Sequence, residues 1–310
     1  MRIMLCVKQI IDVRVSLTLD RRTNTVTAPG TTPLINRADL CALEAAMGLK
    51  ENTPSAEVIA FSIGPANVDK VLRYCLARGV NDAWRIWDEG IPIEDSYVIS
   101  QIISRVARIS QCSLLLCGMM SEDSCSAIVP ALVAEKMSWP WVNRVISIQV
   151  LEDATGITVL QRGEKGGRLE IFCNLPTLLA FYPALSGHQY ISLRRLRLAE
   201  NKPIEIHNLN KLGLQPQELM DSQSPVKVVK VRQPKPRTKR TAIASQQLSG
   251  EELMWQMISG ASGKKDDENL LRGEPEKLAE RILNFLTEKG FYHPSKVSHK
   301  ESNKGDSKKK

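Results

Sequence analysis

The chain has 310 residues, 43% of them hydrophobic and 25% charged, which is enough for one large core and an appendage. No apolar run approaches the roughly 20 residues of a membrane span, and the N-terminal apolar segment is too short for a secretory signal. We therefore expect a cytoplasmic protein without membrane insertion. The whole net charge of +8 lies in residues 223–310, so the electrically neutral body is not a basic nucleic-acid binder.

Cysteine and histidine usage argues against a metal site. The 7 cysteines form no CxxC pair, and none of the 4 histidines has ligand spacing with a cysteine. Such a scattered set favours reduced, buried thiols over disulfides or metal ligands. We also find no Ser/His/Asp or Cys/His arrangement, so the sequence predicts no catalytic residue.

Short apolar runs alternate with helical patterns up to about residue 140. Buried strands are expected at Ile3–Val7, Glu57–Phe61, Ala83–Trp87 and Ser113–Cys117, and helices after Asn36, through Val71 and Cys75 to Gly79, and from Ser96 to Ile109. This alternation is typical of a doubly wound, mostly parallel α/β sheet. Ligands of such sheets bind beyond the carboxyl ends of the strands, so we expect the loops after Cys6, Ile63 and Gly118 to share a cleft.

After Pro140 the pattern changes to short strands with glycine-rich turns, which we expect to extend the sheet as antiparallel hairpins. These strands are Arg144–Leu151, Gly156–Arg162, Leu169–Cys173 and Leu178–Phe181. A separate surface hairpin is expected earlier, at Val13–Thr27, with its turn at Asp20–Asn24.

From Ser186 onward the sequence is irregular and basic. We predict an α/β domain over residues 1–222, then a basic arm over 223–310 with a late helix at about 275–289 and a disordered end.

The stretch Ser113–Met137 carries the strongest functional signal. A buried strand leads into a small polar turn, after which apolar residues recur at helical spacing. Asp123, Ser124 and Ser126 could each cap that helix, and its free N–H groups and positive dipole end would suit a phosphate. The alternative is an ordinary strand-to-helix turn, because most such turns bind nothing.

Seven segments, taken in order, resemble the beta subunit of the electron transfer flavoproteins. They are Cys6–Gln9, Asn36–Ala45, Gly64–Gly79, Gly118–Pro130, Arg162–Pro176, Ser192–Glu205 and Gly273–Gly290, and the likeness covers about residues 1–210 and 273–292. The resemblance implies a heterodimer with a larger alpha subunit that carries the redox-active FAD. That complex accepts electrons from dehydrogenases and passes them on, so the chain is expected to be an electron carrier rather than an enzyme.

The resemblance also implies an internal nucleotide site that holds AMP or a second FAD. By matching motif positions, its residues would be Cys6, Asn36, Arg37, Ala38, Asp39, Ile63, Gly118, Met119, Met120, Ser121, Asp123, Ser124, Cys125, Ser126 and Ala127. These residues belong to the loops that the parallel-sheet argument places in one cleft, which favours the phosphate interpretation. Asp123 could still be a helix cap or a ligand of ribose or magnesium, and Arg37 could meet a phosphate or lie in solvent.

By the same resemblance, Leu193 occupies the position of a recognition-loop leucine, beside a basic rim of Arg194, Arg195 and Arg197. We expect Leu193 to anchor the donor dehydrogenase, because an apolar residue inside a charged rim is the usual anatomy of a small interface. The alternative is that Leu193 packs under the loop.

Two readings from other classes compete with the electron carrier. A stand-alone adenine-nucleotide hydrolase on a similar sheet would need a glycine-rich phosphate loop, and none is found. A nucleic-acid-binding module would rest on the basic stretch 227–240, which has no aromatic residue for base stacking. We favour an arm that lies on the partner subunit.

Overall fold

The computed structural model describes residues 1–15, 17–20, 25–28, 30–53, 55–151, 156–184, 190–215 and 273–292, and the single positions 219, 224, 251 and 254. The chain divides into two compact units, Met1–Gln233 and Pro234–Lys310, which are described separately. The expected arm at 225–246, the hairpin turn at 21–24 and the end after residue 292 lie outside the described residues. The predicted domain boundary at residue 222 stays a prediction.

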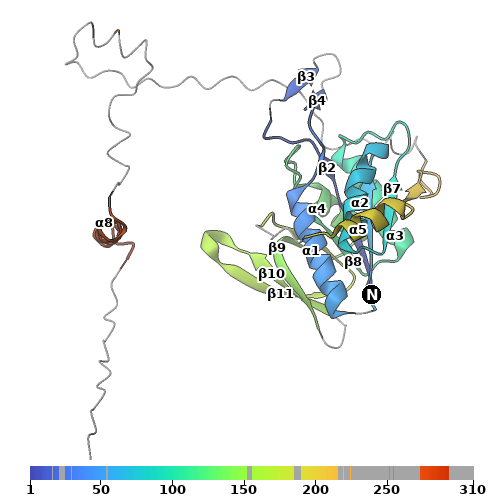
Figure 1. The fold of residues 1–310 in the computed structure, drawn as a ribbon. Helices are drawn as coiled ribbons and strands as arrows, with labels where there is room; N and C mark the ends of the chain where they lie inside the picture. The colour runs from blue at the N-terminus through green and yellow to red at the C-terminus, as the bar shows by residue number, and fades with distance from the viewer. Residues whose placement is uncertain are drawn as a thin grey trace, which may run out of the picture. The chain divides into compact units, whose positions relative to one another are not determined.

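A 9-stranded sheet forms the first unit, in the order β11-β10-β9-β12-β8-β1-β6-β7-β13. Figure 1 labels its strands β7 to β11. Its strands are β1 Arg2–Cys6, β6 Glu57–Ile63, β7 Asp82–Ile86, β8 Leu114–Gly118, β9 Trp141–Val150, β10 Gly156–Arg162, β11 Arg168–Asn174, β12 Thr177–Phe181 and β13 Glu205–His207. From β9 to β13 in that order every neighbouring pair is parallel, whereas β10 pairs antiparallel with β9 and β11. The predicted α/β class is confirmed.

β12 departs from the expected antiparallel hairpin. It lies between β8 and β9 and runs parallel to both, with Leu178 opposite Leu115 on one side and Trp141 on the other. All residues of β12 are buried. An apolar run without a polar face must be covered on both sides, which the centre of a parallel sheet provides and a hairpin at its edge does not.

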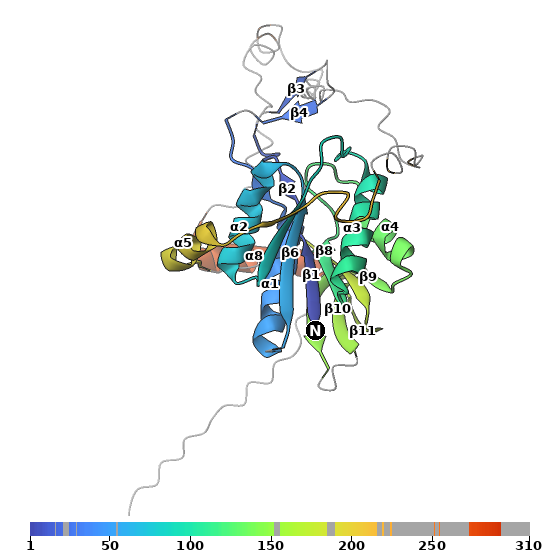
Figure 2. The same ribbon diagram turned by 90° about the vertical axis from the view of Figure 1, so that its right-hand side faces the viewer.

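Helices cover both faces of the sheet (Figure 2). α1 Arg37–Asn52, α2 Asp69–Arg78 and α5 Leu193–Asn201 lie on one face, and α3 Ser96–Ser110 and α4 Val129–Met137 on the other. The 3-10 turns are η1 Ala66–Val68 and η2 Glu164–Gly166. Successive residues of β1 enter the two separate cores, since Ile3 and Leu5 pack on the α1 face and Met4 on the α3 face. Burial on both faces explains why this strand reads as a continuous apolar run.

Four short strands lie apart from the main sheet. β2 Gln9–Ile10 pairs with β5 Leu34–Ile35, and β3 Thr18–Asp20 pairs antiparallel with β4 Thr25–Thr27. The second pair confirms the predicted surface hairpin in the part of it that the structure describes.

α5 replaces the irregular chain expected from Ser186 onward. Ser192 caps its N-terminus, where its hydroxyl accepts a hydrogen bond from the backbone N–H of Arg195 at 3.4 Å. At the other end, Arg73 of α2 donates to the carbonyls of Ala199 at 2.7 Å and Lys202 at 3.2 Å. Because leucine and arginine favour helix and both ends are satisfied, a segment that looks irregular by periodicity is helical.

In the second unit, α8 spans Pro275–Glu288. The predicted late helix is thereby confirmed, with Pro275 in its first turn and Gly290 beyond its end at φ +72°. Within the described part of the chain, no helix combines the length and apolarity needed to cross a bilayer.

Candidate functional site: a cleft at the carboxyl ends of the central strands

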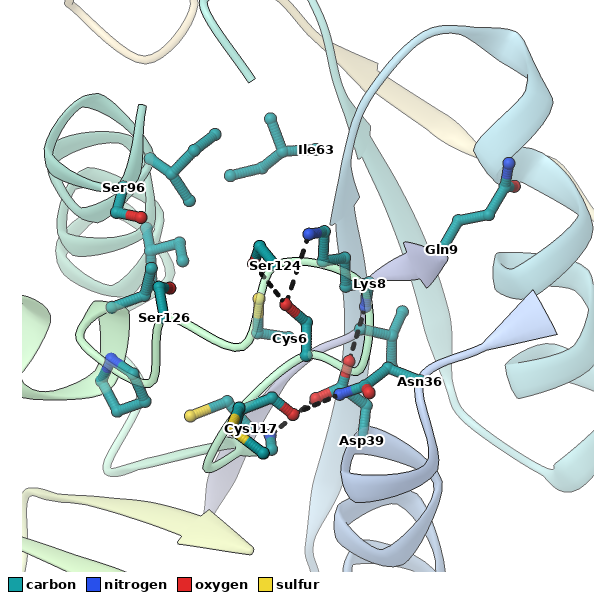
Figure 3. A pocket seen from close by; sticks show the side chains of 18 of the residues that line it. Cys6, Lys8, Gln9, Asn36, Asp39, Ile63, Ser96, Cys117, Ser124 and Ser126 are labelled. Carbon is teal, nitrogen blue, oxygen red and sulfur yellow. Dashed lines mark hydrogen bonds between the residues drawn. The ribbon is translucent and has the colours of Figure 1, made fainter. Parts of the chain in front are cut away.

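The sheet changes its direction of growth between β1 and β8. The chain crosses from β1 to β6 and β7 on one side, and then returns to place β8 on the other side of β1. Loops that leave neighbouring strands at such a point diverge, and a crevice opens beyond the strand ends. A cavity of about 290 Å³ lies there, lined by Cys6 of β1, Ile63 of β6 and the loop that follows β8 (Figure 3).

Most of the residues predicted to bind nucleotide line this cavity. They are Cys6, Asn36, Asp39, Ile63, Gly118, Met119, Met120, Ser121, Asp123, Ser124, Ser126 and Ala127. The structure therefore brings the predicted strand ends together, while their binding of a nucleotide stays a prediction.

Three of the predicted residues do not line the cavity. The exposed Arg37 side chain forms an ion pair with Glu122 at 3.6 Å, and Ala38 is buried in the core. Cys125 is exposed, and its Sγ lies 3.5 Å from the carbonyl oxygen of Glu122. None of the three faces the space that a ligand would occupy.

One wall of the cavity was missed by the sequence analysis. Ile93, Ser96 and Ile99, from the loop after β7 and from α3, face the strand ends across the cavity, and Lys8 lines it directly after β1. Figure 3 shows Ser96 and Ser126 on one side and Lys8 on the other. The strand-end rule could have predicted this wall, because the loop after β7 also leaves the carboxyl end of a parallel strand.

Asp39 joins two strand ends beside the cavity. Its carboxylate accepts hydrogen bonds from the backbone N–H of Lys8 at 2.8 Å and of Gly118 at 2.6 Å. Burial raises the pKa of Asp39 to about 6, although these two hydrogen bonds oppose the shift. The Asp39 carboxylate therefore fixes the positions of two loops. Its protonation would take up one of the two oxygens that accept from the Lys8 and Gly118 N–H groups.

Asn36 holds the same loop through a second pair of contacts. Its Nδ2 donates to the carbonyl of Met120 at 3.1 Å, and its Oδ1 accepts from the backbone N–H of Glu122 at 3.2 Å. Asn36 is itself buried, immediately before α1. The loop after β8 is thus anchored to the start of α1 by side chains that are satisfied within the protein.

The loop before α4 offers backbone donors. Cys125 and Ala127 have φ of +52° and +55°, on either side of Ser126. Within the described residues, the N–H groups of Ser126, Ala127 and Ile128 have no hydrogen-bond partner. Residues that alternate in handedness form a concave nest of N–H groups that suits an anion.

The expected side-chain cap of α4 is wrong. Its N-cap is Ile128, which makes no side-chain cap, and no other described side chain accepts a hydrogen bond from its first turn. Asp123 lies too early in the loop, where its Oδ1 instead accepts from Lys8 Nζ at 2.8 Å and from the backbone N–H of Ser124 at 2.7 Å. The start of α4 is thereby left open toward the cavity.

The two thiols in the cavity are neutral. Burial, followed by the nearby Asp39 carboxylate, raises the pKa of both Cys6 and Cys117. A protonated thiol is a poor nucleophile, so these side chains offer apolar contact surface. Within the described residues, no group of three or more His, Cys, Asp or Glu side chains is placed to hold a metal ion.

The predicted docking residues lie on α5. Leu193, the first residue of the helix, is 60% exposed. An exposed position fits an anchor better than packing under a loop, while its role in docking stays a prediction. Arg194, Arg195 and Arg197, on the same helix, are exposed as well.

Comparison with known proteins identifies the family. Residues 25–184 match the family model described as the electron transfer flavoprotein domain. The chain belongs to the electron transfer flavoprotein beta-subunit family. The resemblance read from the sequence motifs is thereby confirmed, and the chain is a subunit of an electron transfer flavoprotein.

The relatives match along most of their length. The chain is 31% identical over 229 residues to the caffeyl-CoA reductase-Etf complex subunit CarD of Acetobacterium woodii, which covers 74% of this chain and 86% of the relative. It is 32% identical over 192 residues to the electron transfer flavoprotein subunit beta of Methylophilus methylotrophus, covering 61% and 72%. For the mitochondrial subunit beta of Arabidopsis thaliana, the identity is 26% over 250 residues, covering 79% and 94%.

Proposed function

We propose that this electron transfer flavoprotein subunit pairs with a larger, FAD-binding alpha subunit and holds AMP or a second FAD in its own cavity. The pair carries electrons from donor dehydrogenases to an acceptor. The observation that carries the nucleotide assignment is the nest of Ser126, Ala127 and Ile128 N–H groups, which are unpaired within the described residues. It lies at the start of α4, and Ser126 and Ala127 line the cavity.

The residues present fit an adenine nucleotide. A phosphate in the nest would receive backbone N–H donors and the positive end of the α4 dipole. An adenine ring would pack on the neutral Cys6 thiol and on Ile63, both of which line the cavity. A ligand of this shape uses both the polar and the apolar part of the lining.

Redox chemistry in this proposal belongs to FAD, which supplies reversible electron transfer when bound. The chain itself contributes a rigid floor for the nucleotide, because Asp39 and Asn36 fix the loop after β8. It also presents α5, whose exposed Leu193 and arginine rim would receive the donor dehydrogenase. Names among the relatives, such as a caffeyl-CoA reductase-Etf complex subunit and an acryloyl-CoA reductase electron transfer subunit, support assembly with a partner.

Co-expression with the alpha subunit of the same organism tests the proposal. The co-purified complex should be yellow, and denaturation should release FAD together with AMP, or two FAD per complex, identified by mass. The chain expressed alone should be colourless or aggregate. A monodisperse, flavin-free chain that transfers electrons without a partner would contradict the heterodimer.

A further inference from the structure

We propose that Lys8 supplies the cation that binds the ligand phosphate, and that the Asp123 carboxylate holds its ammonium group until the phosphate displaces it. This inference rests on the proposed nucleotide-binding function. Lys8 lies in the Cys6–Gln9 segment that resembles the family, but it was not among the residues expected to bind nucleotide.

Acidic side chains outnumber basic ones in the lining of the cavity, which favours a cation that can contact the phosphate directly. Among the described residues that line the cavity, Lys8 is the one basic side chain, and Asp39, Glu94 and Asp123 contribute carboxylates. A phosphate entering this space would meet more negative than positive charge. Backbone N–H groups offset part of that repulsion, and a free ammonium group would offset more.

In the described structure the ammonium of Lys8 is already paired. Lys8 Nζ lies 2.8 Å from Asp123 Oδ1 and 3.4 Å from the hydroxyl of Ser121. The same Asp123 oxygen accepts from the Ser124 N–H at 2.7 Å. The Asp123 carboxylate thus lies where an anion could lie, between an ammonium group and a backbone N–H donor of the loop proposed to bind phosphate.

The electrostatics of Asp123 agree with this arrangement. Burial alone would raise the pKa of Asp123, but the hydrogen bond and attraction from Lys8 hold it below its ordinary value. The carboxylate is therefore ionised at neutral pH, and it would repel an incoming phosphate unless it moved aside.

Lys8 has a fixed backbone and a movable side chain. Its N–H donates to Asp39 at 2.8 Å, and its carbonyl accepts from the Asn36 N–H at 3.0 Å. The side chain is 45% exposed, so its four-carbon stem can turn toward a ligand without disturbing the strand end. Asp123 is less exposed, at 21%, but its partner lysine is open to solvent on one side, so a phosphate can reach the ammonium group.

The test compares AMP with adenosine on the co-purified complex after its nucleotide has been removed, with binding measured by calorimetry. Lys8→Met should weaken AMP binding by about ten- to a hundredfold, the loss of one charge-assisted hydrogen bond. Adenosine, which has no phosphate, should lose less than about twofold. Lys8→Arg should restore most of the preference for AMP because it keeps the charge.

Asp123→Asn gives a prediction of opposite sign. It keeps an oxygen acceptor for the Ser124 N–H but removes the competing charge, so AMP should bind about two- to fivefold more tightly. Lys211→Met is the matched control, because the Lys211 side chain is as exposed as that of Lys8, at 47%, and pairs with Glu205 at 2.7 Å on a segment that does not line the cavity. It should leave the affinities for AMP and adenosine unchanged.

Each result decides one part of the inference. An unchanged AMP-to-adenosine preference in a folded Lys8→Met complex would overturn the role of Lys8. Weaker AMP binding in Asp123→Asn would make Asp123 a direct ligand and overturn the displacement. A folded native complex that binds neither AMP nor adenosine would instead remove the proposed nucleotide function, and the inference with it.

Discussion

The carboxylate of Asp39 accepts a 2.6 Å hydrogen bond from the backbone N–H of Gly118, 79 positions further along the chain. A Cβ atom at Gly118 would lie 2.6 Å from the Cβ of Ala38 and would also collide with the Asp39 carboxylate. Gly118 is therefore required for close approach of the β8 end to α1, and that approach shapes the floor of the cavity.

Gly118→Ala should destabilise the chain by about 1–3 kcal/mol, because an added methyl group must push apart buried neighbours. Differential scanning calorimetry of the co-purified complex would measure the loss. Gly48→Ala in α1 is the matched control, since a Cβ atom there meets nothing within 4 Å. Alanine favours helix over glycine, so the control should be neutral or stabilising by about 0.5–1 kcal/mol. Equal effects of the two changes would contradict this account of Gly118.

Asp39 should make stability depend on pH in an unusual direction. Its pKa in the folded chain is about 6, above the ordinary 3.8, so the folded state binds more protons between these values. The contribution of Asp39 to stability should therefore fall by roughly 2–3 kcal/mol as pH rises from about 4 to about 6, and be constant above pH 7. Melting temperatures of the native and Asp39→Asn complexes across this range would show the difference between them shrinking with rising pH.

Asp12→Asn provides the comparison for that titration. Hydrogen bonds from Arg14 lower the pKa of Asp12 to about 2, so this group does not titrate in the window. The difference in melting temperature between the Asp12→Asn and native complexes should therefore not change above pH 4. A pH-independent or rising difference for Asp39→Asn would refute the proposed protonation.

The central elements were predictable because their residues carry the signal locally. The apolar run Glu57–Phe61 predicted β6 from a few neighbouring residues. In the same way, Pro275 in the first turn and Gly290 beyond the end predicted α8. The position and direction of β12 were not predictable, since Leu178–Phe181 is apolar throughout and says nothing about which strands lie beside it.

The site was predictable as a set of loops but not as a set of contacts. The rule for strand ends brought Cys6, Ile63 and Gly118 together correctly. The hydrogen bonds of Asp39 were out of reach, because they go to backbone N–H groups of residues distant in sequence. The Lys8–Asp123 pair was out of reach for the same reason, because its members lie 115 positions apart in the sequence.

Leu193→Ala should slow electron transfer from the donor dehydrogenase by an amount equivalent to about 1–3 kcal/mol, as expected when the anchor of a small interface is truncated. Because Leu193 is exposed, the melting temperature and flavin content should hardly change. Steady-state transfer rates at varied dehydrogenase concentration would measure the effect.

Leu198→Ala is the control for surface apolarity on the same helix. Leu198 is 62% exposed and lies five residues further along α5, which turns it about 140° away from Leu193. It should leave transfer unchanged. If both variants transfer at the native rate, the arginines at 194, 195 and 197 become the next candidates for the docking surface.

The nucleotide content of the Ser126→Glu complex tests the central claim most directly. Ser126 lines the cavity beside the open N–H groups, so a carboxylate there would repel a phosphate in a poorly screened cleft. Cys125→Glu adds the same charge one residue away, outside the lining. We predict that Ser126→Glu co-purifies with its flavin but with far less than one cavity nucleotide per complex, while Cys125→Glu retains it. Native nucleotide stoichiometry in Ser126→Glu would contradict the assignment of this cavity.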